Sequence, residues 1–111
     1  MKNAITMLIA LAILFTLSAA LCLGAGDAAA GKDMFLKKCK MCHGEDGAGT
    51  PAMLKKYGEK MRPLGSPAIQ GMKDPEMAKA VKEAANHKSL AKALTDKDVD
   101  NLVAHIRTLK K

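Results

Sequence analysis

Two cysteines and a histidine stand together in one five-residue run, Cys39-Lys40-Met41-Cys42-His43. Cys-x-x-Cys-His is the covalent attachment sequence for a c-type haem. Two thiols at this spacing can each add to one vinyl group on the porphyrin edge, and the adjacent imidazole then lies under the iron as its proximal ligand. The run therefore predicts one covalently bound haem c as the cofactor. Cys39 and Cys42 are the predicted thioether attachment points, and His43 is the predicted proximal iron ligand.

Two other uses of paired cysteines fit the chain less well. A thioredoxin-like dithiol needs a βαβ context, and no segment here alternates apolar and polar residues as a strand does. A structural zinc site needs four ligands, and the positions of His87 and His105 match no common zinc-finger spacing. Haem attachment is the stronger interpretation.

The N-terminal residues have the pattern of an export signal. Lys2 precedes an uncharged run from Ala4 to Leu23, and small residues follow it as far as Ala30. A basic start, an apolar middle and an Ala-x-Ala end are typical of a secretory signal peptide. We predict a signal peptide over residues 1–30, cut after Ala30 or a few residues earlier, and a periplasmic location. The alternative is an uncleaved membrane anchor, because the apolar run approaches the roughly 20 residues that span a bilayer.

The remaining domain, residues 31–111, is small. It has 81 of the 111 residues and keeps the net charge of +7. A domain of this size buries only about 60% of the surface that its unfolded chain exposes, so a disulfide, a metal or a cofactor usually completes the core. A disulfide between Cys39 and Cys42 would close almost no loop and would stabilise little. The missing core material is therefore predicted to be a cofactor.

Hydrophobic periodicity predicts an all-α domain. Only 3% of residues are aromatic, which argues against a β-sandwich or barrel. We expect helices from Gly31 to about Met41, over residues 51–57, from residue 74 to at least Ala84, and from Thr95 to the C-terminus. Thr95 and Asp98 resemble a capping box at the start of the last helix. Five apolar residues of that helix fall on one stripe, at helical spacing: Val99, Leu102, Val103, Ile106 and Leu109.

Three segments resemble small class I cytochromes c. GKDMFLKKCKMCHGEDGAGTP is similar to the family's N-terminal part, RPLGSPAIQ to the loop that lies on the haem, and NLVAHIRTLKK to the C-terminal helix. The resemblance implies a cytochrome c-like domain of three to five short helices wrapped round one covalently bound haem. It also implies that the first and last helices cross near Gly31, Phe35 and the Leu102–Ile106 face.

The resemblance also assigns expected roles to single residues. Pro63 and Leu64 would pack on a haem face and help to exclude water. His105 takes the family's usual Tyr position in the last helix. It would therefore pack against the first helix and not bind iron.

The second axial ligand is the point at which the chain departs from the family pattern. Members usually place a Met ligand about seven residues before the Leu of a Leu-Ser/Thr-Asp helix start. Here that start is Leu94-Thr95-Asp96, the count reaches His87, and residues 85–90 contain no Met. We therefore predict His87 as the distal ligand, which gives bis-imidazole iron at a lower potential than a Met ligand would. The alternatives are Met61 and Met72, which flank the loop over residues 63–71.

These features predict a periplasmic electron carrier and not an enzyme. Lysines gather beside the motif, in the middle of the chain and around the distal loop: Lys37, Lys38, Lys40, Lys55, Lys56, Lys60, Lys88 and Lys92. If they surround the exposed haem edge, they would steer an acidic redox partner. The plainer alternative is a solvated surface that keeps a small monomeric domain soluble. Nucleic-acid binding is not expected, because stacking aromatics are lacking, and membrane contact would require an uncleaved N-terminal segment.

Two other functions stay open at this point. One is a haem-based sensor or a small peroxidase-like protein with a labile distal ligand, although neither Arg62 nor Arg107 adjoins a histidine in the sequence. The other is the haem module of a membrane respiratory complex, which an uncleaved anchor would favour.

Overall fold

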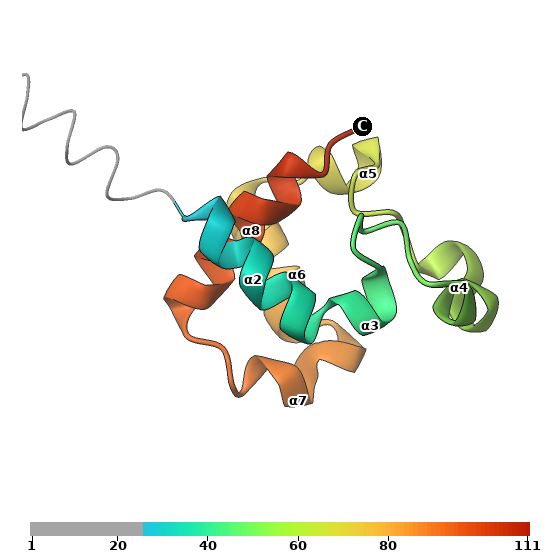
Figure 1. Cartoon of the computed structure of the whole chain (residues 1–111), viewed down its shortest axis with the longest axis horizontal. Helices are drawn as coiled ribbons and strands as arrows, with labels where there is room; N and C mark the ends of the chain where they lie inside the picture. Colours follow the sequence, from blue (N-terminus) through green and yellow to red (C-terminus); the bar gives the residue numbers. More distant parts are fainter. Residues whose placement is uncertain (1–25) are drawn as a thin grey trace, which may run out of the picture.

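The computed structural model describes residues 26–111, and within that range it contains helices and no strand. Four helices have seven or more residues: α2 (Ala28–Lys38), α4 (Pro51–Tyr57), α6 (Asp74–Glu83) and α8 (Asp96–Thr108). Single helical turns connect them: α3 (Lys40–His43), η1 (Gly58–Lys60), α5 (Pro67–Gln70), η2 (Ala85–His87) and α7 (Lys88–Ala91). Figure 1 shows their arrangement. The predicted all-α architecture is confirmed.

The predicted apolar leader lies mostly outside the described residues, which begin at residue 26. Between there and the C-terminus, no helix is both long and apolar enough to cross a bilayer.

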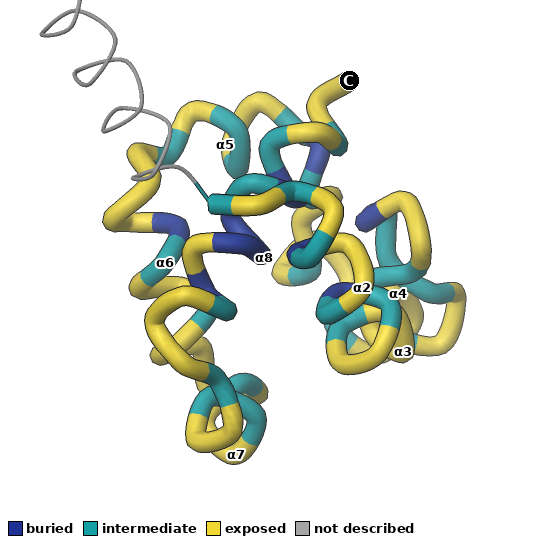
Figure 2. The backbone as a smooth tube through the Cα atoms, turned by 60° about the vertical axis from the view of Figure 1, so that its left-hand side comes forward, coloured by how far each residue is buried: buried dark blue, intermediate teal, exposed yellow. Residues whose placement is uncertain are grey.

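The frame of the domain is the crossing of α2 and α8, as the resemblance implied (Figure 1). At Gly31 the two backbones approach so closely that an added Cβ would lie 1.9 Å from the Asn101 carbonyl oxygen. Phe35 of α2 and Val99 and Leu102 of α8 are each only 1% exposed. Figure 2 shows the buried backbone, in dark blue, mainly along α8.

Helix α8 begins where its sequence predicts. The Thr95 hydroxyl accepts a hydrogen bond from the Asp98 backbone N–H at 3.1 Å, and the Asp98 carboxylate accepts one from the Thr95 N–H at 3.0 Å. These two bonds complete a capping box, which satisfies two of the N–H groups that a helix start leaves without partners. Four residues of the predicted apolar stripe are buried, and Leu109 is half-buried after the helix end.

Helix α2 begins earlier and ends earlier than predicted. It starts at Ala28, because the Asp27 carboxylate caps it by accepting hydrogen bonds from the N–H groups of Ala29 and Ala30 at 2.9 and 3.2 Å. It ends at Lys38, and a turn at Cys39 separates it from α3. The expected start at Gly31 and the expected continuous helix to Met41 were therefore wrong. The predicted cut after Ala30 would fall inside α2, and its position stays a prediction.

A second cluster joins α6 to α8. Met77, Val103 and Ile106 are buried together, and four half-buried side chains pack on them: Leu64, Ile69, Ala78 and Val81. The loop before α6 is fixed by polar contacts to α8. Arg107 binds the Asp74 carboxylate at 2.7 Å and the Gln70 carbonyl at 2.7 Å. The segment over residues 59–73 contains most of η1 and all of α5.

Candidate functional site

The five-residue run forms a single helical turn. The backbone N–H groups of Cys42 and His43 both donate to the Cys39 carbonyl, at 3.2 and 2.9 Å. Residues three and four positions apart share one face of a helix, so Cys39, Cys42 and His43 lie on a common face. Met41, on the other face, is 85% exposed. Both thiols are free, with Cys39 half-buried and Cys42 exposed.

The glycine-rich loop after this turn folds back on it. Gly44 ends α3 with φ of 74°, a left-handed conformation that favours glycine. The N–H of Gly49 then donates to the His43 carbonyl at 2.7 Å, and the N–H of Thr50 donates to the Cys42 carbonyl at 3.1 Å. The loop thereby satisfies carbonyl groups that the end of α3 would leave unpaired, and it holds the run in place.

The structure brings His43 and His87 together, although they are far apart in sequence. Their ring centroids lie 6.0 Å apart, with an interplanar angle of 64°. Two imidazoles on opposite sides of one metal ion have centroids about 6 Å apart, because each metal–nitrogen bond is about 2 Å and each nitrogen lies about 1 Å from its ring centre. The spacing of this pair therefore fits a shared iron.

The hydrogen bonds of His87 define its tautomer. Its Nδ1 lies 3.0 Å from the Val81 carbonyl oxygen and 3.2 Å from the Ala80 carbonyl oxygen, both in the last turn of α6. A carbonyl only accepts, so Nδ1 carries the proton and Nε2 carries the lone pair that a metal needs. A backbone carbonyl bonded to the second nitrogen is the usual partner that orients a histidine ligand. The sequence did not lead us to predict these two hydrogen-bond acceptors. The end of a helix shortly before His87 was the available signal, because the last turn of a helix leaves carbonyl groups unpaired.

Comparison with known proteins identifies the family of this chain. The sequence model of the family "Cytochrome c" matches residues 28–110. The chain belongs to the cytochrome c family. Its structure is similar to that of the KustC0563 c-type cytochrome, with 27% sequence identity and a TM-score of 0.62, over 73% of this chain and 98% of that one. No curated protein sequence matches the chain. Like other cytochrome c domains, this one binds haem c covalently and uses it for electron transfer.

Burial keeps His43 of this cytochrome c domain in the form that binds metal. The pKa of His43 is lowered, chiefly by burial and secondly by the charge of His87, so the ring is neutral and able to donate a lone pair. Its Nδ1 is buried and has no hydrogen-bond partner among the described residues. Before haem attachment, burial also raises the pKa of Cys39, the Cys42 sulfur raises it further and Lys38 opposes both.

The two methionine candidates have other neighbours in this cytochrome c domain. The Met61 sulfur lies beside Gly49, 3.6 Å from the position that a Cβ there would occupy, and Leu54 packs at the same place. The Met72 carbonyl oxygen accepts a hydrogen bond from Arg107. The Met61 contacts lie beside α4, and the Met72 contact lies just before α6. His87 is the candidate for which the structure gives a measured approach to His43.

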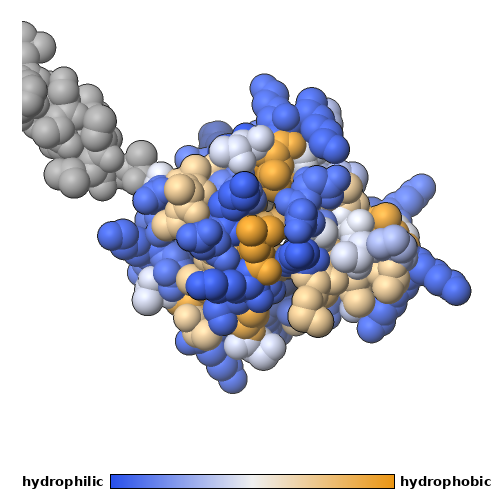
Figure 3. All heavy atoms as spheres, in the orientation of Figure 1, coloured by the Kyte–Doolittle hydropathy of each residue, from blue (hydrophilic) through white to orange (hydrophobic). Residues whose placement is uncertain are grey.

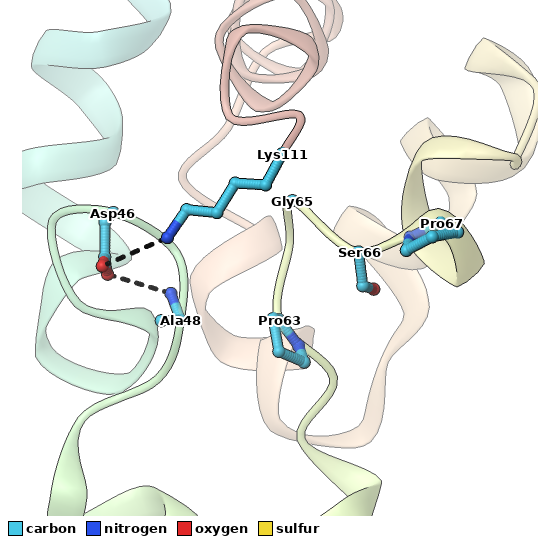
Figure 4. A pocket seen from close by; sticks show the side chains of 7 residues that line it. All are labelled: Asp46, Ala48, Pro63, Gly65, Ser66, Pro67 and Lys111. Carbon is cyan, nitrogen blue, oxygen red and sulfur yellow. Dashed lines mark hydrogen bonds and ion pairs between the residues drawn. The ribbon is translucent and has the colours of Figure 1, made fainter.

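Pro63 and Leu64 lie on the loop between η1 and α5. Leu64 packs against the cluster of Met77, Val103 and Ile106. Pro63 is exposed and lines a small cavity of about 140 Å³ beside the Asp46–Lys111 ion pair (Figure 4). Their packing on the haem stays a prediction.

His105 occupies the place that the resemblance implied. It is 6% exposed, and its ring centroid lies 5.0 Å from that of Phe35 in α2. Phe35 in turn lies 6.4 Å from the His43 ring. His105 therefore belongs to the helix crossing, and Phe35 connects that crossing to the site. In residues 26–111, no three His, Cys, Asp or Glu side chains gather as they would in a metal site made of protein ligands alone.

Proposed function

We propose that this chain is a periplasmic carrier of single electrons on one haem c, attached through Cys39 and Cys42 and held between His43 and His87. The observation that carries the proposal is the approach of the two imidazole rings to 6.0 Å. The family match supports the haem and its electron transfer. The export pattern before residue 31 supports the location.

The haem supplies an iron that takes up and releases one electron when it is bound. The chain sets the conditions for that exchange. Burial keeps His43 neutral, and the hydrogen bond from His87 Nδ1 to the Val81 carbonyl fixes the orientation of that ring. Two protein ligands leave no position open for an external molecule. Because a Met ligand raises the potential of a cytochrome c, the His pair predicts a potential below that of His/Met relatives.

The proposed partner is an acidic redox protein that docks as a separate molecule on a monomeric carrier. The lysines named in the sequence analysis are all exposed. Lys37 and Lys38 directly precede the attachment run and Lys40 lies within it, beside the exposed apolar side chain of Met41. Figure 3 shows small apolar areas enclosed by hydrophilic side chains on one face of the molecule. A positive rim of this kind steers a negative partner and loses strength as salt rises.

Two measurements on the purified haem protein test the carrier function. A potentiometric titration should give one reversible one-electron transition. The reduced protein should bind carbon monoxide slowly or not at all, because His43 and His87 would both hold the iron. Rapid carbon monoxide binding, or a high-spin oxidised spectrum, would instead support a sensor or a peroxidase-like protein.

Charge reversal beside the attachment run tests the docking surface. The double variant Lys37→Glu/Lys38→Glu should lower the second-order rate of electron transfer to an acidic partner by about tenfold at low ionic strength. Its rate should also depend less on salt, while the potential stays unchanged. Lys97→Glu, in the first turn of α8, is the control. The same logarithmic loss per reversed charge in both variants would mean that only net charge matters and that this surface is not the docking site.

A further inference from the structure

Asp27 is built into the folded domain by two kinds of contact. Its carboxylate caps α2, as described above, and its backbone N–H donates to the Asn101 side-chain oxygen at 2.8 Å. Asn101 is buried in α8, with 9% of its surface exposed. Asp27 therefore starts the first helix and also ties that start to the last helix.

Gly26 also lies against α8. An added Cβ would be 2.2 Å from the Asp100 carbonyl oxygen and 2.6 Å from its carbon. Only a residue without a side chain permits this approach. Gly26 also lines a cavity of about 350 Å³ together with Asp74 and Asp100. Arg107, which is paired with Asp74, lines the same cavity, so Asp100 is the carboxylate that a new amino terminus here could meet.

A cut after Ala30 would damage this arrangement. It would remove Asp27 and the first three of the eleven residues of α2. The new ammonium group would belong to Gly31, a buried residue packed against the Asn101 carbonyl. Burying this positive charge away from water carries a desolvation cost, whereas Asp27 is exposed.

We propose that the leader is cut within the small-residue segment over residues 24–27. The mature chain then begins at Ala25, Gly26 or Asp27, and it keeps Asp27. Gly24, Ala25 and Gly26 are the residues directly before these three bonds, and export peptidases cut after small residues. This processing site rests on the export that we propose above.

The first test is the N-terminus of the exported protein. The full chain is expressed in a bacterium that attaches haem c, recovered from the periplasm, and analysed by intact mass and by its N-terminal peptide. A first residue of Ala25, Gly26 or Asp27 is expected. Any other first residue, including Gly31 or an uncut Met1, would overturn the proposal. The haem spectrum of the same sample reports on the carrier function separately, so the two can fail independently.

The second test does not depend on the natural leader. Two chains are exported behind a foreign signal peptide, one beginning at Gly26 and the other at Gly31. The chain from Gly31 should give less holoprotein, or a melting midpoint lower by about 5 °C or more. Asp27→Asn in the longer chain is the control, because asparagine keeps a capping oxygen. Equal midpoints for the two chains would contradict the proposal.

Discussion

Where α2 crosses α8, the chain's own side chains fill the interface, whereas the short helices that contain or follow His43 and His87 bury none of their residues. At the crossing, Phe35, Val99 and Leu102 are almost wholly buried. A buried ring nitrogen without a partner among the described residues occurs in both regions, at His43 Nδ1 in the site and at His105 Nε2 in the crossing. The short helices α3, α4 and α7 contain no buried residue at all.

This difference explains how so small a chain makes a stable domain. The crossing is a frame that holds the attachment run at one end, through Phe35 and the turn at Cys39. The site lies at one end of this crossing, and a cofactor must complete its packing. Changes at the site and changes at the crossing should therefore have different effects, the largest of which comes from losing the cofactor.

The largest effect is expected when haem attachment is prevented. Cys39→Ser/Cys42→Ser should lose most of the helical circular dichroism and the cooperative thermal transition, because the apolar surface around the site then has no partner. Met41→Ala, in the same run but on the exposed face, should leave both intact. A double variant that melts cooperatively at the wild-type temperature would show that the frame is stable without the cofactor.

A change within the crossing should also destabilise the protein strongly. Gly31→Ala places a Cβ against the Asn101 carbonyl and should lower the free energy of unfolding by about 2–3 kcal/mol, measured by denaturant titration of the holoprotein. The control is Gly58→Ala, where a Cβ meets open space but φ is 56°. Its cost should be only about 1 kcal/mol. Equal costs would mean that the close approach contributes little.

A change at the site should alter the potential and leave the frame intact. His87→Met should raise the reduction potential by on the order of 0.1 V, because a thioether favours the reduced iron more than an imidazole does. Redox titration measures this shift. His105→Phe, a change at a histidine of the crossing, should leave the potential near that of the wild type. An unchanged potential in His87→Met would remove His87 from the site.

The smallest expected effect is a pH dependence of stability that comes from His105 at the crossing of α2 and α8. Burial, and secondly the charge of Lys32, lowers the pKa of His105 in the folded protein. The unfolded chain therefore binds this proton more readily than the folded protein does. The free energy of unfolding is therefore unaffected by His105 above the ordinary histidine pKa of about 6.5, and it falls as the pH drops below that value. His105→Phe should flatten the dependence of the melting midpoint on pH over this range. Parallel profiles for the two proteins would contradict a role for His105.

Local signals in the sequence predicted several helix boundaries correctly. The capping box at Thr95 and the helix between Pro51 and Gly58 depend on neighbouring residues. The start of α2 was missed because Ala28–Ala30 reads equally well as a peptidase site. The backbone N–H of Asp27, the capping residue, donates a hydrogen bond to the Asn101 side chain, 74 positions away. No local sequence pattern predicts a contact between residues so far apart.

The site was predictable to a similar extent. His43 follows directly from the spacing of the attachment run, which is local. His87 came from counting residues in a family pattern, and its role as a ligand stays a prediction. The bond from its Nδ1 to the Val81 carbonyl could not be foreseen, because it depends on how η2 turns back against the end of α6.

The far-red absorption spectrum of the purified oxidised protein tests most directly whether His43 and His87 hold the iron. A methionine ligand gives a weak sulfur-to-iron charge-transfer band there, and a pair of imidazoles does not. The account predicts a low-spin Soret band and no far-red sulfur band. A clear sulfur band would contradict it and assign the sixth position to a methionine, with Met61 and Met72 as the candidates.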